Sequence, residues 1–278
     1  TLASATTYAT SGNTIKPLVN RTETIEATVA ASKNITLDLN GKTITLKNQT
    51  LKNNGTLTIT GSGTLTGSGA NTVTNAGTLT KTGTSKIINT STSAYGAIRN
   101  TGTATISAGT ITSAYRTITN SNKLTMTGGT ITGSDIAVNN SGTATVTGGT
   151  ITSTGKIGIY NTAEGKLTIG TNETTPSVST TVPSVTGKTY GVQAGKTFNF
   201  YDGVIKGQSG KGTSINGTIT ATPTGYGVRK TSSTVNSVTT ETAVLVPANY
   251  AEYNGSTIIS YYETLASATT YATSGNTI

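Results

Sequence analysis

A short internal repeat between Asn100 and Asn161 constrains the fold more than any other feature of the chain. It reads NTGTATISAGTITSAYRTIT, then NSNKLTMTGGTITGSDIAVN, then NSGTATVTGGTITSTGKIGIY. The copies begin at Asn100, Asn120 and Asn140, and Asn161 opens a fourth, so the steps are 20, 20 and 21 residues. A fixed period of this length, with alternating Thr-x-Ile and regular Gly, is typical of a solenoid built from strands.

The alternation within each copy predicts which side chains face the interior. Successive residues of a strand point to opposite sides, so every second residue can be buried. Three apolar columns result, and three columns indicate three strands per coil. The first column holds Leu57/Ile59, Ala104/Ile106, Leu124/Met126, Ala144/Val146 and Leu167/Ile169, the second Ile111, Ile131 and Ile151, and the third Ile98, Ile118, Val138 and Ile159, continued by Val192 and Val228.

The composition suits a narrow core and removes several chemistries. Only 32% of residues are hydrophobic and 5% aromatic, which is low for a globular domain with a wide core. The sequence contains no Cys and no His, so it has no disulfides, no thiol chemistry and no imidazole base or metal ligand.

The two ends of the chain are identical. Residues 1–15, TLASATTYATSGNTI, recur letter for letter at 264–278, a step of 263 residues. This recurrence predicts a tandem array of which the chain holds one unit and the start of the next. The apolar spacing in residues 1–12 predicts a short helix that caps the first coil, with an extended linker as the alternative.

Several stretches resemble the pectate-lyase-like right-handed β-helices of large bacterial surface and adhesin-like proteins. They are YYETLASATTYATSGNTIKPLV, KNITLDLNGKTITL, GTLTITGSGTLTGSG, TYGVQAG, KTFNFYDGVIKG and GYGVRK. The resemblance implies an all-β fold, a right-handed parallel β-helix with tandem repeats, and a cell-surface setting. It implies no reaction.

We expect the β-helix to occupy residues 13–250. The period breaks at 171–189, around Pro176 and Pro183, which predicts an excursion from the solenoid. Residues 251–263 would form a junction, and 264–278 would begin the next unit. The turn signal Asn40-Gly41 would mark a corner of the solenoid.

One coil departs from the pattern, because Lys81 takes an inward position. A buried charge is costly, and this coil is also longer, with 25 residues from Asn75 to Asn100. We therefore expect a bulge or a change of register there.

The aligned asparagines are interpreted as a structural ladder at one corner of the coils. Asn tolerates the left-handed backbone conformation, and its amide can bond to the next rung. The ladder comprises Asn75, Asn100, Asn120, Asn140 and Asn161.

Outward threonines form a regular array that is a candidate binding face. Such arrays are similar to the ice-binding faces of some antifreeze solenoids, although Thr is favoured on any exposed sheet and Lys123 and Lys166 interrupt this one. The candidate residues are Thr103, Thr105, Thr125, Thr127, Thr143 and Thr145.

No catalytic, cofactor or metal site is predicted. Glycoside hydrolysis needs two carboxylates about 5–10 Å apart, and the aspartates Asp38, Asp135 and Asp202 lie far apart in the sequence. We expect no enzyme activity and no cofactor.

The net charge of +9 is spread over scattered residues, so we expect no nucleic-acid partner. We find neither a signal peptide nor an apolar run long enough to insert into a membrane, and expect a mature fragment of an extracellular protein. The leading hypothesis is a structural or adhesive module of a bacterial surface fibre. Its partners would be neighbouring identical units joined head to tail and, secondarily, cell-wall or host glycans. The alternatives are a carbohydrate-binding or carbohydrate-active β-helix and an ice-binding solenoid.

Overall fold

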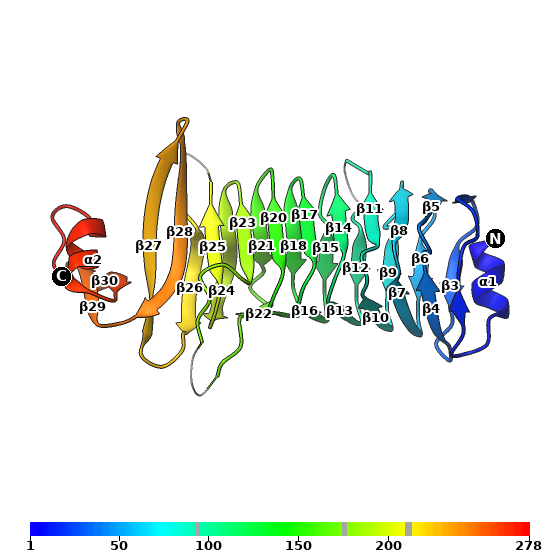
Figure 1. Ribbon diagram of the computed structural model, residues 1–278, viewed down its shortest axis with the longest axis horizontal. Helices are drawn as coiled ribbons and strands as arrows, with labels where there is room; N and C mark the ends of the chain where they lie inside the picture. The colour runs from blue at the N-terminus through cyan, green and yellow to red at the C-terminus, as the bar shows by residue number, and fades with distance from the viewer. Residues whose placement is uncertain (93–94, 174–176, 209–212) are drawn as a thin grey trace.

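The computed structural model describes residues 1–92, 95–173, 177–208 and 213–278. It is a right-handed parallel β-solenoid of about nine turns with a short helix at its N-terminal end. Figure 1 shows the turns stacked side by side along the long axis, with the two termini at opposite ends. The predicted fold class is confirmed.

Each turn contributes one strand to each of three faces, which we call the first, second and third face. Strands of successive turns pair in parallel and in register on every face. The first face holds β1 (Thr14–Ile15), β4 (Asn34–Asp38), β7 (Thr56–Thr60), β10 (Thr78–Lys81), β13 (Thr103–Ile106), β16 (Lys123–Met126), β19 (Thr143–Val146) and β22 (Lys166–Ile169).

The second and third faces follow the same order along the chain. The second face holds β2 (Arg21–Glu23), β5 (Lys42–Lys47), β8 (Gly63–Ser68), β11 (Lys86–Asn89), β14 (Thr110–Ser113), β17 (Thr130–Gly133), β20 (Thr150–Ser153), β23 (Ser184–Gly187) and β25 (Val204–Gly207). The third face holds β3 (Ala27–Val29), β6 (Leu51–Asn53), β9 (Val73–Asn75), β12 (Ile98–Asn100), β15 (Ile118–Asn120), β18 (Ile136–Asn140) and β21 (Ile157–Asn161). The longer strands β24 (Tyr190–Phe200) and β26 (Ile215–Ala221) run across the third face and onto the first.

The predicted apolar columns form the core. Ile111, Ile131 and Ile151 are fully buried and lie opposite one another on consecutive strands of the second face. Each turn adds only a few aliphatic side chains, but stacking makes them one continuous interior, which is how a repeat that cannot bury its own face becomes stable. The corner prediction at Asn40-Gly41 also agrees, since β4 and β5 flank it and pair with other strands.

The third column ends earlier than the sequence suggests. Val192 continues it in register with Ile159. Val228 does not, because it lies in β27 (Tyr226–Val235), which pairs antiparallel with β28 (Val238–Pro247) as a long hairpin. The parallel coils therefore stop at β26, before the boundary near residue 250 that the repeat pattern indicates. β28 pairs antiparallel with β25 and closes the second face.

The expected excursion at 171–189 is shorter in the structure. Ser184–Gly187 is strand β23, held in register between β20 and β25, so the chain has returned to the solenoid by Ser184. Pro176, one of the two prolines on which the prediction rested, lies outside the described residues.

The expected irregularity at Lys81 is wrong. Lys81 lies in register between Ile59 and Ile106, without a bulge, and its side chain is fully buried. The extra length of this coil falls between β11 and β12, at a corner rather than inside a strand.

The first coil is covered by helix α1 (Leu2–Tyr8), as the sequence predicts. Its N-cap is Thr1, whose side chain accepts a hydrogen bond from the Ser4 amide. Leu2 and Thr6 are buried beneath it. A solenoid end exposes unpaired strand edges, and a covering helix protects them.

The C-terminal end has a second helix, α2 (Leu265–Tyr271), which packs against the small hairpin β29 (Tyr250–Asn254) and β30 (Thr257–Tyr262). In Figure 1 this group lies beyond the β27–β28 hairpin, at the opposite end of the molecule from α1. The two helices have the same sequence, LASATTY.

Candidate functional site

The asparagine ladder lies at the corner where the third face turns into the first. Each member is the last residue of its strand and is fully buried. The side-chain amide of each donates to the amide oxygen of the next, at 2.6–2.7 Å. The structure adds Asn53, so the ladder runs through Asn53, Asn75, Asn100, Asn120, Asn140 and Asn161.

The same amides also bind the backbone at the corner. The amide nitrogen of Asn100 donates to Gly102 O and to Lys123 O of the next coil. Such a chain satisfies buried polar groups that would otherwise be costly. The ladder therefore fixes the corner of each coil, and its groups are all occupied by the protein itself.

The backbone expected for these asparagines is wrong. Among the described residues, positive φ occurs at Asn40, Asn48 and Asn236, and at no member of the ladder. The left-handed conformation at the regular coils belongs instead to Gly109 and Gly129, at the corner between the first and second faces.

The predicted threonine array lies on the outside of the first face. Thr105 pairs with Thr80 and Thr125, and Thr125 pairs with Thr145, so one column of threonines continues from coil to coil. The neighbouring column is broken, because Lys123 stands between Thr103 and Thr143. Thr127 follows the end of β16 rather than lying within it.

A second threonine array, which the sequence reasoning missed, lies on the second face. Each of three coils carries Thr-Ile-Thr with the Ile inward, and the flanking threonines pair with their counterparts on the next coil. No charged residue interrupts these six positions, and all are half-buried. The signal was present in the sequence as the residues on either side of the second inward column. The array comprises Thr110, Thr112, Thr130, Thr132, Thr150 and Thr152.

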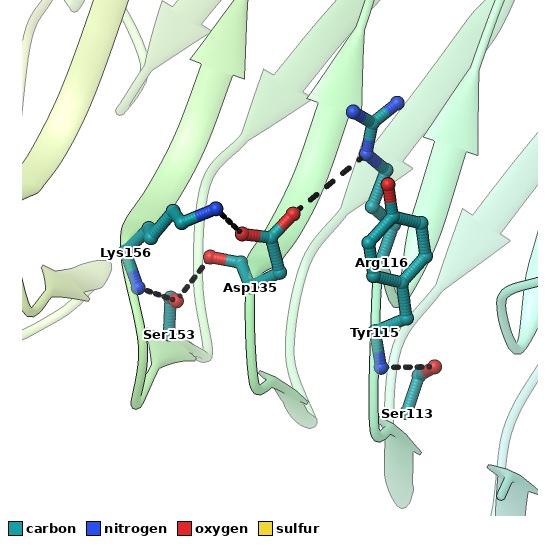
Figure 2. A network of polar contacts seen from close by, with 6 residues as sticks. All are labelled: Ser113, Tyr115, Arg116, Asp135, Ser153 and Lys156. Carbon is teal, nitrogen blue, oxygen red and sulfur yellow. Dashed lines mark hydrogen bonds and ion pairs between the residues drawn. The ribbon is translucent and has the colours of Figure 1, made fainter. Parts of the chain in front are cut away.

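A charged corner lies next to this array, between the second and third faces, and is drawn in Figure 2. Asp135 accepts an ion pair from Lys156 at 2.7 Å and lies 4.0 Å from Arg116. The guanidinium of Arg116 stacks over the ring of Tyr115 at 5.2 Å. The Asp135 carboxylate raises the pKa of Lys156. Two cations share one carboxylate here, so the arrangement links three coils and offers no acid pair.

The remaining aspartates are engaged in separate structural contacts. Asp38 forms an ion pair with Lys16 at 3.0 Å, and hydrogen bonding to Lys16 holds its pKa below the ordinary value. Asp202 accepts hydrogen bonds from the Ser179 and Gly203 amides. Burial raises the pKa of Asp202, with the Glu173 charge as a smaller cause. The proximity of Glu173 was not evident from the sequence.

Metal and membrane candidates are also absent from the part of the chain that the structure describes. Within residues 1–92, 95–173, 177–208 and 213–278, no three acidic side chains gather where they could hold a metal ion. No helix in these ranges has the length and apolar character needed to cross a membrane.

Lys81 is the one strongly perturbed cation of the interior among the described residues. Its ammonium donates to the carbonyl oxygens of Thr82 at 2.9 Å and Ala108 at 3.2 Å. Burial lowers its pKa to about 8. Since it contacts backbone carbonyls and lies in a closed interior, it acts as a corner support within the fold.

Comparison with known proteins gives no relative. No family model matches this chain, and neither a curated protein nor a solved structure matches it.

Proposed function

We propose that the chain is a non-enzymatic structural module of a long extracellular bacterial fibre or adhesin. The observation that carries this proposal is the recurrence of residues 1–15 at 264–278 on either side of one complete solenoid. A solenoid contacts only its neighbours along the axis, so joining units lengthens the molecule without a new design. The resemblance to pectate-lyase-like bacterial surface proteins supports the same setting.

Electron microscopy of the native protein from the cells that make it tests this function. The proposal predicts elongated particles or fibres with a regular axial repeat. Isolated particles of single-unit size would overturn it. A glycan array and a reducing-sugar assay on the same material are the companion measurements. Cleavage of a polysaccharide would move the assignment to the carbohydrate-active alternative.

Ice binding is a second candidate, favoured by the uninterrupted threonine array of the second face. Its threonines repeat at about 4.8 Å between coils and about 6.8 Å along each strand. Thermal hysteresis of the purified chain is the measurement. Thr132→Lys should abolish it, whereas Thr125→Lys on the first face should leave it unchanged. Absence of hysteresis in the unmodified chain removes this candidate.

A further inference from the structure

The two copies of the terminal segment fold in the same way but bury different sides. Thr1 and Thr264 cap helices α1 and α2, accepting hydrogen bonds from Ser4 and Ser267 at 3.0 and 3.1 Å. Both helices extend over seven residues. The internal structure of the segment is therefore independent of what it touches.

The side of the helix that α1 buries is exposed in α2. Leu2 is 5% exposed against the first coil, while its counterpart Leu265 is 53% exposed. Thr6 is likewise buried, and its counterpart Thr269 is exposed. An exposed leucine beside an exposed threonine is therefore a surface whose partner is visible elsewhere in the same molecule, namely the first coil of a solenoid.

The opposite side of the helix is buried only in α2. Ala268 is fully buried and α2 packs on β29 and β30, whereas its counterpart Ala5 is partly exposed. The two contact surfaces lie on different sides of one helix, so a single copy can make both contacts at once.

The strand after each helix shows the same division. In β1, Thr14 pairs with Thr36 in parallel, with the carbonyl of Asn13 accepting from the Thr36 amide. A residue paired in this way uses the groups of its neighbours, so its own N–H and C=O point to the other edge. In the second copy those groups of Thr277 bond to Tyr253, at 3.1 and 2.7 Å. The two pairings use different edges of the strand and are compatible.

The loop between helix and strand carries a matching exchange of hydrogen bonds. In the first copy, the Thr10 amide donates to the side chain of Asn13 at 2.7 Å. In the second copy, Glu252 takes both groups. The Thr273 amide and the Asn276 side chain donate to its carboxylate at 2.6 and 2.7 Å.

Glu252 is itself buried and held by the hydroxyl of Tyr262 at 2.6 Å. The carboxylate therefore belongs to a built receptor for this segment. Hydrogen bonding to Asn276, Tyr262 and Thr273 outweighs the opposing effect of burial and lowers its pKa.

We propose that the recurring segment is a shared joint, clamped on one side by the β29–β30 hairpin of the preceding unit and on the other by the first coil of the following one. The exposed side of α2 would then dock a second copy of residues 16–47 that follows in the same chain. The inference rests on the proposed tandem function and deepens it: consecutive units would be joined by packing and backbone hydrogen bonds rather than by a flexible linker.

Exposed apolar side chains gather at the two ends that this joint would bring together. Tyr8, Leu18, Val19 and Ile25 belong to the N-terminal end, and Tyr250, Tyr253, Ile258, Ile259, Leu265 and Tyr271 to the C-terminal end. Contiguous exposed apolar surface of this kind marks an interaction site.

Thiol labelling tests the joint without background, because the chain contains no Cys. The probes are Leu265→Cys and the sterically milder Thr269→Cys, each placed in the 278-residue chain and in a two-unit chain made of residues 1–263 followed by 1–278. Both probes should react rapidly in the single unit. In the two-unit chain both should react more slowly, on the order of tenfold or more, because the site must open before it reacts.

Val235→Cys is the matched control, since Val235 is 67% exposed at the tip of the β27–β28 hairpin. Its rate should be the same in both chains. Equal, rapid labelling of positions 265 and 269 in a folded two-unit chain would overturn the joint, while fibres of the native protein would still support the proposed function. Single-unit native particles would remove the proposed function whatever the labelling shows.

Discussion

The middle coils and the ends of this molecule satisfy their surfaces in different ways. Between β13 and β22, apolar side chains face the interior and the corner amides bond to one another, so each coil is completed by its neighbours. At the ends, one sequence segment is half covered in each of its two positions. The comparison teaches that the repeat of single coils specifies a stable rod, whereas the repeat of whole units specifies how rods join.

The largest effect should come from breaking the middle of the asparagine ladder. Asn120→Ala removes a donor to Asn140 and an acceptor for Asn100 and leaves both partners short of a buried contact. We expect a loss of about 2–4 kcal/mol in the free energy of unfolding, measured by urea denaturation.

The control for this change is Ser121→Ala, an exposed neighbour at the same corner, which should change the free energy by under about 0.5 kcal/mol. Asn53→Ala should lie between the two, because Asn53 ends the ladder and its amide oxygen has no partner among the described residues. An equal cost for Asn53 and Asn120 would show that the ladder does not act as a chain.

The buried ammonium in the regular stack gives the next effect. Lys81→Met removes the cost of burying a charge and should raise the free energy of unfolding by about 2 kcal/mol at pH 7. The folded pKa of about 8 lies below the model-compound value of 10.5. The unfolded chain therefore holds the proton over this window, and the stability of the unmodified protein should rise between these pH values.

Above that window the difference between Lys81→Met and the unmodified protein should stop changing. Denaturation curves of both proteins at pH 7, 9 and 11 check this, with the variant serving as control for every other titrating group. A difference that is constant across this range would contradict the burial argument.

The two helices offer a matched pair at the ends. Leu2→Ala should cost about 1.5 kcal/mol, because Leu2 packs on the first coil, while Leu265→Ala should cost less than about 0.5 kcal/mol. Thermal unfolding of the two variants of the same chain compares them directly. In the two-unit chain, Leu265→Ala should become as costly as Leu2→Ala, and an unchanged small cost would count against the joint.

The smallest effect is expected at the charged corner of Figure 2. Lys156 is 66% exposed, and exposed ion pairs contribute little to stability. Lys156→Ala should leave the unfolding midpoint unchanged within error, at low and high salt alike. A marked, salt-sensitive loss would show that this corner supports the stack more than the ladder comparison suggests.

Periodicity made the middle of the molecule predictable. Ile111, Ile131 and Ile151 repeat at a fixed step, and a narrow core leaves only one side on which they can be buried. The same logic was not carried to the threonines beside them, so the array on the second face was missed. Lys81 kept its register because its ammonium reaches carbonyl oxygens at a corner, a compensation that no single-residue pattern reveals.

The ends resisted prediction for physical reasons. Antiparallel hairpins and parallel coils share the same alternation, so β27 and β28 could not be distinguished from another turn by pattern alone. Their turn uses Asn236 and Ser237 at positive φ, a weaker signal than Asn-Gly. Nor could the sequence indicate which side of LASATTY is buried, because both copies read alike and only their surroundings differ.

The central claim is that consecutive units form one continuous structure, and a distance measurement between units tests it most directly. Spin labels on Thr143→Cys in each solenoid of the two-unit chain report that distance, since Thr143 is exposed on the first face and no other thiol is present. The shared joint predicts a single narrow distribution of distances. A broad distribution, from two folded units moving independently, would contradict it.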